Sequence, residues 1–200
     1  KVHDHLVKFL EYADLPPTQG LWFGGVLIIA TLLIWQINSS FSWRVDLKTI
    51  TMMAIEAIAA TIPLLALGAV FGNMIAASSS TAIGELTLFD KLAVSIGAGL
   101  YEEFVFRMLV IALVHTIAIR LFKQTNEMGL LAGVLLSAIL FAMYHDLPDA
   151  GTLPAISLFF YGIAGIYLGL LFVFRGFGIT AATHTIYDVV ATTILAVIAV

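Results

Sequence analysis

Long apolar runs, separated by short polar stretches, dominate this 200-residue chain. A helix needs about 20 apolar residues to cross the hydrocarbon core of a bilayer. Six runs approach or exceed that length, at residues 21–37, 50–77, 89–122, 129–144, 153–174 and 178–200. The pattern predicts an all-α fold: a polytopic transmembrane helical bundle with about six transmembrane helices.

The same pattern divides the chain into three parts. Residues 1–19 form a polar N-terminal segment, 20–88 hold two N-terminal transmembrane helices, and 89–200 form a helical core. The helix over 89–122 would be about 50 Å long, well beyond the ~30 Å core. It must therefore tilt, project from the membrane, or bend near Gly97–Gly99. Because the chain starts with Lys1 rather than Met, we expect segments upstream of it.

Composition sharpens this interpretation. The chain is 61% hydrophobic and only 11% charged, whereas soluble domains carry about 25% charged residues. An ordinary soluble fold is excluded, and the lipid bilayer is the expected partner. The formal net charge is −4, without a dense basic cluster, which argues against nucleic acid as a partner. No cysteine is present, so disulfides, thiolate metal sites and thiol nucleophiles are excluded.

Several ionisable side chains fall inside the predicted spans. Each costs about 3 kcal/mol at the centre of a membrane helix, so such residues are usually paired or functional. We expect Glu56 to contact another helix or line a cavity entrance, and His115 to face packing. The full set is Glu56, Glu102, Glu103, Arg107, His115, His145, His184 and Asp188.

The first of three motifs is Glu102-Glu103 followed by Arg107. Glu103 and Arg107 lie about 40° apart and one turn along a helix, so they can pair. Glu102 points about 140° away from Arg107 and lacks that partner. The spacing predicts one neutralised carboxylate and one that is free to act as a general base. A structural charge cluster between helices is the alternative.

The other two motifs supply imidazoles. Phe141 and His145 share a helix face, and His184 and Asp188 repeat the four-residue spacing, so Asp188 can hold the His184 ring and fix its tautomer. Either histidine could instead serve packing. Combined with Glu102, the imidazoles could position a water, deprotonate it and stabilise an oxyanion. Glu102, His145 and His184 could also bind zinc or another divalent metal as a His₂Glu set.

These ordered motifs resemble the CPBP family of intramembrane proteases, which comprises CAAX proteases and bacteriocin-processing enzymes and is also called the Abi family. The family pattern is EExxxR, then FxxxH, then HxxxN or HxxxD on successive core helices. The stretch from Phe160 to Leu171 also resembles the family. The resemblance covers residues 90–200, whereas 1–89 match only as generic hydrophobic helices. The motifs run here from Glu102 to Arg107, from Phe141 to His145, and from His184 to Asp188.

The resemblance implies an intramembrane endopeptidase with its site in a water-filled cavity. Its substrate would be a membrane-embedded or lipid-anchored peptide or protein, including the prenylated CAAX type. Glu102 would activate the water and His145 would orient it. Glu103 and Arg107 would support the site. The oxyanion would be stabilised by His184 and Asp188.

One position departs from the prenyl-processing members, which carry Asn where this chain has Asp188. An ionised Asp cannot donate to an oxyanion, so Asp188 would have to be protonated or merely orient His184. The departure favours a bacterial-type member in a prokaryotic cell membrane. Family members are described both as metallopeptidases and as metal-independent glutamate peptidases. The absence of an HExxH helix favours the second description, with no cofactor.

Two other function classes fit the buried charges. A transporter could use the carboxylates and imidazoles as an ion or proton relay, although no inverted repeat is visible. A non-catalytic membrane scaffold could bind a partner. Counting along the helices also puts His145 near one membrane face and His184 nearer the other, so a working site requires helices at unequal depths or a deep cavity.

Overall fold

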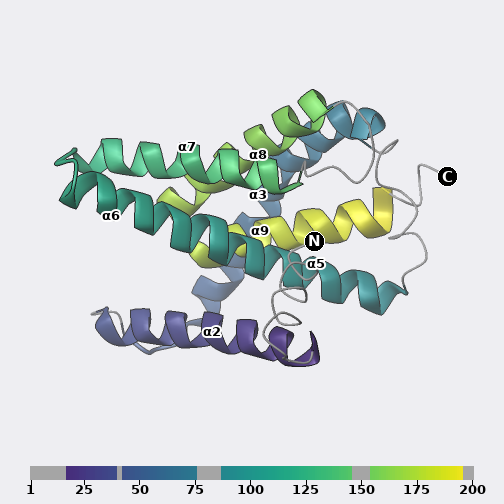
Figure 1. The fold of residues 1–200 in the computed structure, drawn as a ribbon. Coiled ribbons are helices and arrows are strands. Elements are labelled where there is room, and N and C mark those ends of the chain that lie inside the picture. Colours follow the sequence, from purple (N-terminus) through teal and green to yellow (C-terminus); the bar gives the residue numbers. More distant parts are fainter. Residues whose placement is uncertain (1–16, 40–41, 76–86, 146–153, 196–200) are drawn as a thin grey trace. The chain divides into compact units, whose positions relative to one another are not determined.

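The computed structural model describes residues 17–39, 42–75, 87–145 and 154–195, and over these ranges it contains helices and no strand. The elements α5, η2 and α6 follow one another without a break, as do α9 and η3, so the described part of the chain forms six helices (Figure 1). The predicted all-α fold is confirmed. The elements are α2 (Pro17–Asn38), α3 (Leu47–Ile75), α5 (Leu88–Glu102), η2 (Glu103–Ile111), α6 (Ala112–Arg120), α7 (Asn126–His145), α8 (Pro154–Arg175), α9 (Phe177–Val190) and η3 (Ala191–Leu195).

The chain divides into two compact units, Lys1–Ile50 and Thr51–Val200. In the first unit, Asp46 caps α3: its carboxylate accepts hydrogen bonds from the backbone N–H groups of Lys48 and Thr49, both at 3.2 Å. This arrangement satisfies donors that a helix start otherwise leaves unpaired. Most of the predicted polar segment, residues 1–16, lies outside the described residues.

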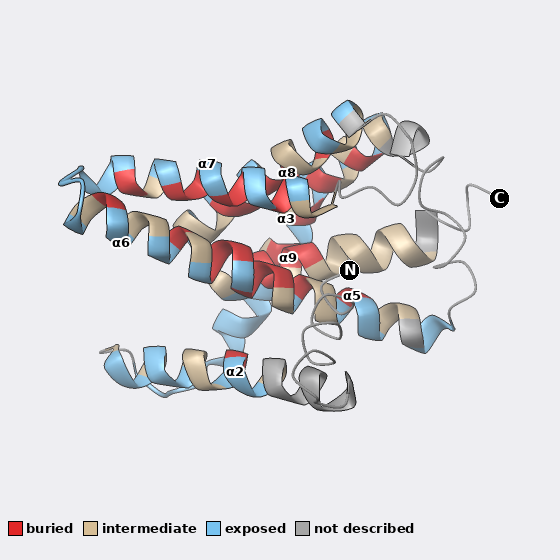
Figure 2. Cartoon of the chain, in the orientation of Figure 1, coloured by how far each residue is buried: buried red, intermediate tan, exposed pale blue. Residues whose placement is uncertain are grey.

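In the second unit, the long helix formed by α5, η2 and α6 changes partner along its length. Its α5 portion packs on α9, whereas η2 and α6 pack on α7, which in turn packs on α8. Figure 2 shows buried residues along η2, α7 and α9, where these helices face one another. Phe104, Ile111 and Val134 are among them, each at most 3% exposed. The point at which the long helix changes partner positions the functional site.

Apolar side chains also cover the outside of the helices. Ile58, Leu135 and Phe159 are among many large hydrophobic residues that are at least 44% exposed. Among the described residues, three helices are long and apolar enough to cross a membrane: Leu47–Phe71, Asn126–His145 and Ala155–Arg175. A lipid environment would solvate these side chains, because hydrocarbon tails accept apolar surface without the cost that water imposes.

The long helix keeps its α-helical form at Gly97–Gly99, near which a bend was one of the expected options. These residues lie within α5, and the irregular backbone is the π-helical segment η2, which begins at Glu103. Gly99 instead permits close packing. A Cβ atom there would lie 2.1 Å from Thr185 Oγ1 and 2.9 Å from the Thr185 backbone nitrogen. Small residues at such contacts let membrane helices approach closely.

Polar contacts attach α3 to the helices beside it. The Thr183 hydroxyl donates to the Ala57 carbonyl, and the Thr61 hydroxyl contacts the Thr183 carbonyl, both at 3.3 Å. The Tyr167 hydroxyl donates to the Ala60 carbonyl at 2.7 Å. These bonds give hydroxyl groups partners in surroundings that offer little water. The two bonds of Thr183 also hold α9 against α3 at the position next to His184.

Candidate active site

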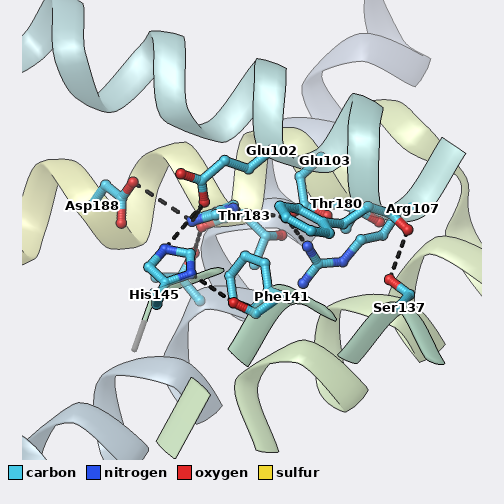
Figure 3. Close-up of polar contacts among 12 residues, drawn as sticks. Glu102, Glu103, Arg107, Ser137, Phe141, His145, Thr180, Thr183 and Asp188 are labelled. Carbon is cyan, nitrogen blue, oxygen red and sulfur yellow. Dashed lines mark hydrogen bonds and ion pairs between the residues drawn. The ribbon is translucent and has the colours of Figure 1, made fainter. Parts of the chain in front are cut away.

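The three sequence motifs meet in one cluster. Glu102 ends α5, Glu103 and Arg107 lie in η2, His145 ends α7, and His184 and Asp188 lie in α9 (Figure 3). The Nε2 atoms of His145 and His184 lie 3.4 Å and 4.0 Å from Oε2 of Glu102. The helices are therefore packed so that the two imidazoles approach the same carboxylate oxygen.

Glu103 links two of these residues. Its Oε1 atom lies 3.1 Å from Nη1 of Arg107, in the ion pair that the four-residue spacing predicted. The same oxygen accepts a hydrogen bond from His184 Nδ1 at 2.7 Å. Glu103 and Arg107 are both fully buried. A buried arginine requires such a counter-charge, because an unpaired buried ion is strongly destabilising.

The bond that fixes the His184 ring was not predicted from the sequence. We expected Asp188 to hold it, but Asp188 Oδ2 lies 3.6 Å from Nε2 of His184, beyond hydrogen-bonding distance. Glu103 holds the other ring nitrogen instead. Because a carboxylate accepts, His184 carries its proton on Nδ1, and Nε2 faces Glu102 and Asp188.

His145 is held in a similar way by a backbone group. Its Nδ1 donates to the Phe141 carbonyl at 2.9 Å, so Nε2 presents a lone pair to Glu102 when the ring is neutral. The ring also stacks on Tyr161, with centroids 4.3 Å apart and planes inclined by 22°. Sequence analysis did not assign Tyr161 a role, although it lies in the stretch from Phe160 that resembles the protease family.

The Phe141 ring contacts Arg107 and both imidazoles. The Arg107 guanidinium carbon lies 4.2 Å from the centroid of the Phe141 ring, a cation–π contact. Within the described residues, Arg107 Nε and Nη2 have no hydrogen-bond partner. Buried polar atoms of this kind commonly bind ordered water. The guanidinium is therefore held by charge and by an aromatic face more than by hydrogen bonds.

The remaining ionisable residues lie apart from this cluster. Glu56 forms an ion pair with Arg175 and thereby joins α3 to α8, which confirms the expected contact with another helix. His115 was expected to face packing. Its ring packs on α7 as expected, since a Cβ atom at Gly129 would lie 3.1 Å from His115 Cδ2, and its Nε2 also lies 2.9 Å from Oδ1 of Asn126.

The metal hypothesis involves Glu102, His145 and His184. Their potential donor atoms approach one another, at 3.4 Å and 4.0 Å from Glu102 Oε2. Across the described part of the chain, however, no group of three or more His, Cys, Asp or Glu side chains is arranged to hold a metal ion. Zinc binding by these residues stays a prediction that a chelator can test.

The cluster is suited to acid–base chemistry on a bound water. Oε2 of Glu102 is buried and, within the described residues, has no hydrogen-bond partner. It faces the Nε2 atoms of His145 and His184. In each neutral ring the proton lies on Nδ1, which donates to the Phe141 carbonyl or to Glu103. A water between these groups would find acceptors for both of its hydrogens, and a carboxylate positioned to receive one.

The comparison with known protein families identifies the family of this chain. The family model described as "Type II CAAX prenyl endopeptidase Rce1-like" matches residues 84–190, a range that includes all six candidate site residues and more than half of the chain. The comparisons of this chain with curated proteins and with solved structures found no match. With its long apolar helices, the chain is an integral membrane protein. It belongs to the Rce1-like family of type II CAAX prenyl endopeptidases, as its ordered motifs indicated.

Proposed function

We propose that this protein is a multi-pass intramembrane endopeptidase that hydrolyses a peptide bond with a water activated by Glu102. The observation that carries the proposal is the approach of two imidazole nitrogens, at 3.4 Å and 4.0 Å, to the buried Oε2 of Glu102. A buried carboxylate costs free energy in a membrane protein, and such residues usually belong to functional sites. Membership of a family of prenyl endopeptidases supports peptide hydrolysis as that function.

In the proposed first step, Glu102 takes a proton from the water while the water oxygen attacks the carbonyl carbon of the scissile bond. The C=O π electrons move to oxygen and form the oxyanion. His145 orients the water by accepting its second hydrogen at Nε2. This role agrees with the Nδ1 bond to Phe141, which fixes the tautomer.

In the second step, Glu102 returns the proton to the amide nitrogen as the C–N bond breaks. The products are a carboxylic acid and an amine, so the side chain ends in its starting state. General acid–base catalysis by a positioned carboxylate contributes about 10²- to 10⁴-fold. The same group acts in both steps because it faces the water and the leaving nitrogen in turn.

His184, with Asp188 beside it, is the proposed oxyanion group. Its Nδ1–H is committed to Glu103, so Nε2 can donate only when the ring is an imidazolium. The carboxylates of Glu103 and Asp188 favour that form by their charge. Arg107 balances Glu103. A preorganised donor of this kind is worth about 3–4 kcal/mol in other hydrolases.

The proposed substrates are membrane-embedded or lipid-anchored peptides and proteins, including prenylated CAAX-type ones, in a prokaryotic cell membrane. The apolar outer surface of the helices supports this choice, because it would keep the site at the depth where such substrates lie. We propose residues 89–200 as the catalytic core, since all six site residues lie there.

The experiment that tests the proposal incubates the purified protein with a library of membrane-anchored peptides, with and without a prenyl group. The wild type is compared with Glu102→Gln and with Glu127→Gln, a control change in the first turn of α7. We expect cleavage by the wild type and the control, and a loss of at least about 10²-fold in Glu102→Gln. No cleavage by folded wild type, or full activity in Glu102→Gln, would overturn the proposal.

The same assay with added chelator addresses the metal. Activity that persists in chelator would indicate a glutamate peptidase without a labile metal. Activity that is lost and then restored by zinc would indicate a metallopeptidase, in which Glu102, His145 and His184 would be the first residues to test as ligands.

A further inference from the structure

Access to the cluster is uneven. The side chains of Glu103 and Arg107 are fully buried, and those of Glu102 and His184 are 8% and 7% exposed. Those of His145 and Asp188 are 18% and 23% exposed. In Figure 3 Asp188 and Arg107 lie at opposite ends of the group. A substrate therefore meets His145 and Asp188 first, and the arginine is out of its reach.

The charges of the cluster do not cancel. Three carboxylates, those of Glu102, Glu103 and Asp188, lie with one guanidinium and two imidazoles. With neutral imidazoles the sum is −2, and with one imidazolium it is −1. Glu103 is already paired with Arg107, so the uncompensated charge lies on the side of the cluster that holds Glu102 and Asp188. In surroundings with little water, such a charge acts strongly on any charged group that approaches it.

The Asp188 carboxylate acts on His184 through its charge, without a hydrogen bond to the ring. Its Oδ2 is 3.6 Å from His184 Nε2, and His184 is already held through Nδ1 by Glu103. Within the described residues no hydrogen bond to the Asp188 carboxylate is present. The carboxylate is therefore an acceptor at the accessible edge of the site, close to where the reaction occurs.

We infer that Asp188 selects substrates: it favours a cationic side chain close to the scissile bond and disfavours an acidic one. The inference rests on the proposed function, since it assigns the substrate class of the same site. An ammonium or guanidinium group can donate to the Asp188 carboxylate and compensate the charge of the cluster. A carboxylate at the same place would add to an uncompensated negative charge, which is the usual way in which a site rejects a wrong partner.

The test uses three anchored peptides that differ at one residue, next to the scissile bond on its leaving side. That residue is Lys, norleucine or Glu, so that length is similar and only charge changes. The quantity measured is the ratio of kcat/KM for the Lys and Glu peptides, in the wild type and in Asp188→Asn. Because each ratio is taken within one protein, a general loss of activity in Asp188→Asn does not affect it.

We expect the wild type to prefer the Lys peptide by at least about tenfold, the change that 1.4 kcal/mol of differential binding produces. In Asp188→Asn the ratio should fall toward one, with the norleucine peptide intermediate in the wild type. A ratio near one in the wild type, or a ratio in Asp188→Asn that is unchanged from the wild type, would overturn the inference. Cleavage without a charge preference would leave the proposed peptidase function standing.

A binding measurement separates the two proposals in the other direction. The Glu102→Gln variant in lipid nanodiscs is titrated with the fluorescently labelled Lys and Glu peptides. The titration is repeated with the double variant that carries Glu102→Gln and Asp188→Asn. Tighter binding of the Lys peptide that depends on Asp188 supports the inference even if no peptide is cleaved by the wild type. Equal binding of both peptides contradicts it.

Discussion

Nδ1 of His184 lies 2.7 Å from Oε1 of Glu103, although the two residues are 81 positions apart in the chain. The same oxygen lies 3.1 Å from Nη1 of Arg107. Glu103 therefore does two things at once: it neutralises a buried cation and it fixes the ring that we propose as the oxyanion group. Loss of its charge should affect the stability of the protein as well as the chemistry.

Glu103→Gln should destabilise the protein by about 3–5 kcal/mol, because it leaves the buried Arg107 without a counter-charge. The measurement is denaturant or thermal unfolding in detergent. Glu102→Gln is the matched control, since it removes the neighbouring carboxylate but not the ion pair, and its effect should be smaller.

A double variant tests the cause of that loss. Glu103→Gln with Arg107→Met removes both charges, so it should recover part of the stability that Glu103→Gln loses. If Glu103→Gln is as stable as the wild type, or if the double variant is less stable by the sum of the two single losses, the ion pair does not carry the stability that we assign to it.

The sequence predicted those features of the site that lie within one helix. The pairing of Glu103 with Arg107 follows from helical periodicity, and it is present. The bond from Glu103 to His184 depends on how α5 and η2 pack against α9, which no spacing within a motif encodes. The same reason explains why counting along the helices put His145 and His184 at different depths. The count cannot include the stagger between helices, which is a property of packing and here brings both rings to Glu102.

The fold shows the same division. Apolar runs bounded by polar residues gave the helices near their observed ends, for example 126–145 against the predicted 129–144. The π-helical segment η2 was not predicted. Its wider turn depends on the register of backbone hydrogen bonds, which side-chain type influences only weakly, and such segments often lie at functional sites. Here it begins at Glu103, beside the proposed catalytic carboxylate.

Gly99→Ala should lower peptidase activity by disturbing the contact of α5 with α9. The added Cβ would lie 2.9 Å from the Thr185 nitrogen and 3.0 Å from its Cα, so backbone must move and not only a side chain. Thr185 follows His184, and a displacement of about 1 Å at a catalytic group can cost about 10²-fold in rate. The measurement is kcat on the best-cleaved peptide.

Gly97→Ala is the control for this change. It lies two residues earlier in the same helix, and a Cβ there would have nothing within 4 Å. We expect activity near that of the wild type, with stability unchanged or slightly raised, because Ala favours helix over Gly by about 1 kcal/mol. Equal activity losses in the two variants would show that helix propensity, not the close contact, sets the result.

Asp46 should make the start of α3 sensitive to acid. The Thr49 hydroxyl and the backbone N–H groups of Lys48 and Thr49 donate to its carboxylate and lower its pKa. A carboxyl with a lowered pKa in the folded state stabilises the fold above its unfolded pKa, near 3.9. This contribution is lost as the pH falls through the folded-state pKa.

The measurement compares the melting temperatures of the wild type and Asp46→Ala from pH 7 to pH 2. The wild type should be more stable at neutral pH, and the difference should shrink below about pH 4, where the carboxylate protonates. Asp46→Asn keeps a cap that does not titrate, so its difference from Asp46→Ala should persist in acid. A wild-type advantage that is constant over the whole pH range would contradict the role of the charge.

Tyr161→Leu should lower kcat by about 3- to 10-fold, because aromatic pairs are worth about 0.5–1.5 kcal/mol beyond their buried area. The Tyr161 ring stacks on the His145 imidazole at 4.3 Å, and its loss would remove the stacked ring while the tilted Phe141 ring and the bond to the Phe141 carbonyl remain. Tyr161→Phe keeps the stacked face and should retain activity. Phe159→Leu, which removes an exposed ring from the same helix, is the control for aromatic loss in general.

Because His145 is proposed to orient the water rather than to bind the peptide, KM should change little in Tyr161→Leu. An effect on KM alone, or equal losses in the Leu and Phe variants of Tyr161, would show that Tyr161 acts on the substrate or through its hydroxyl instead.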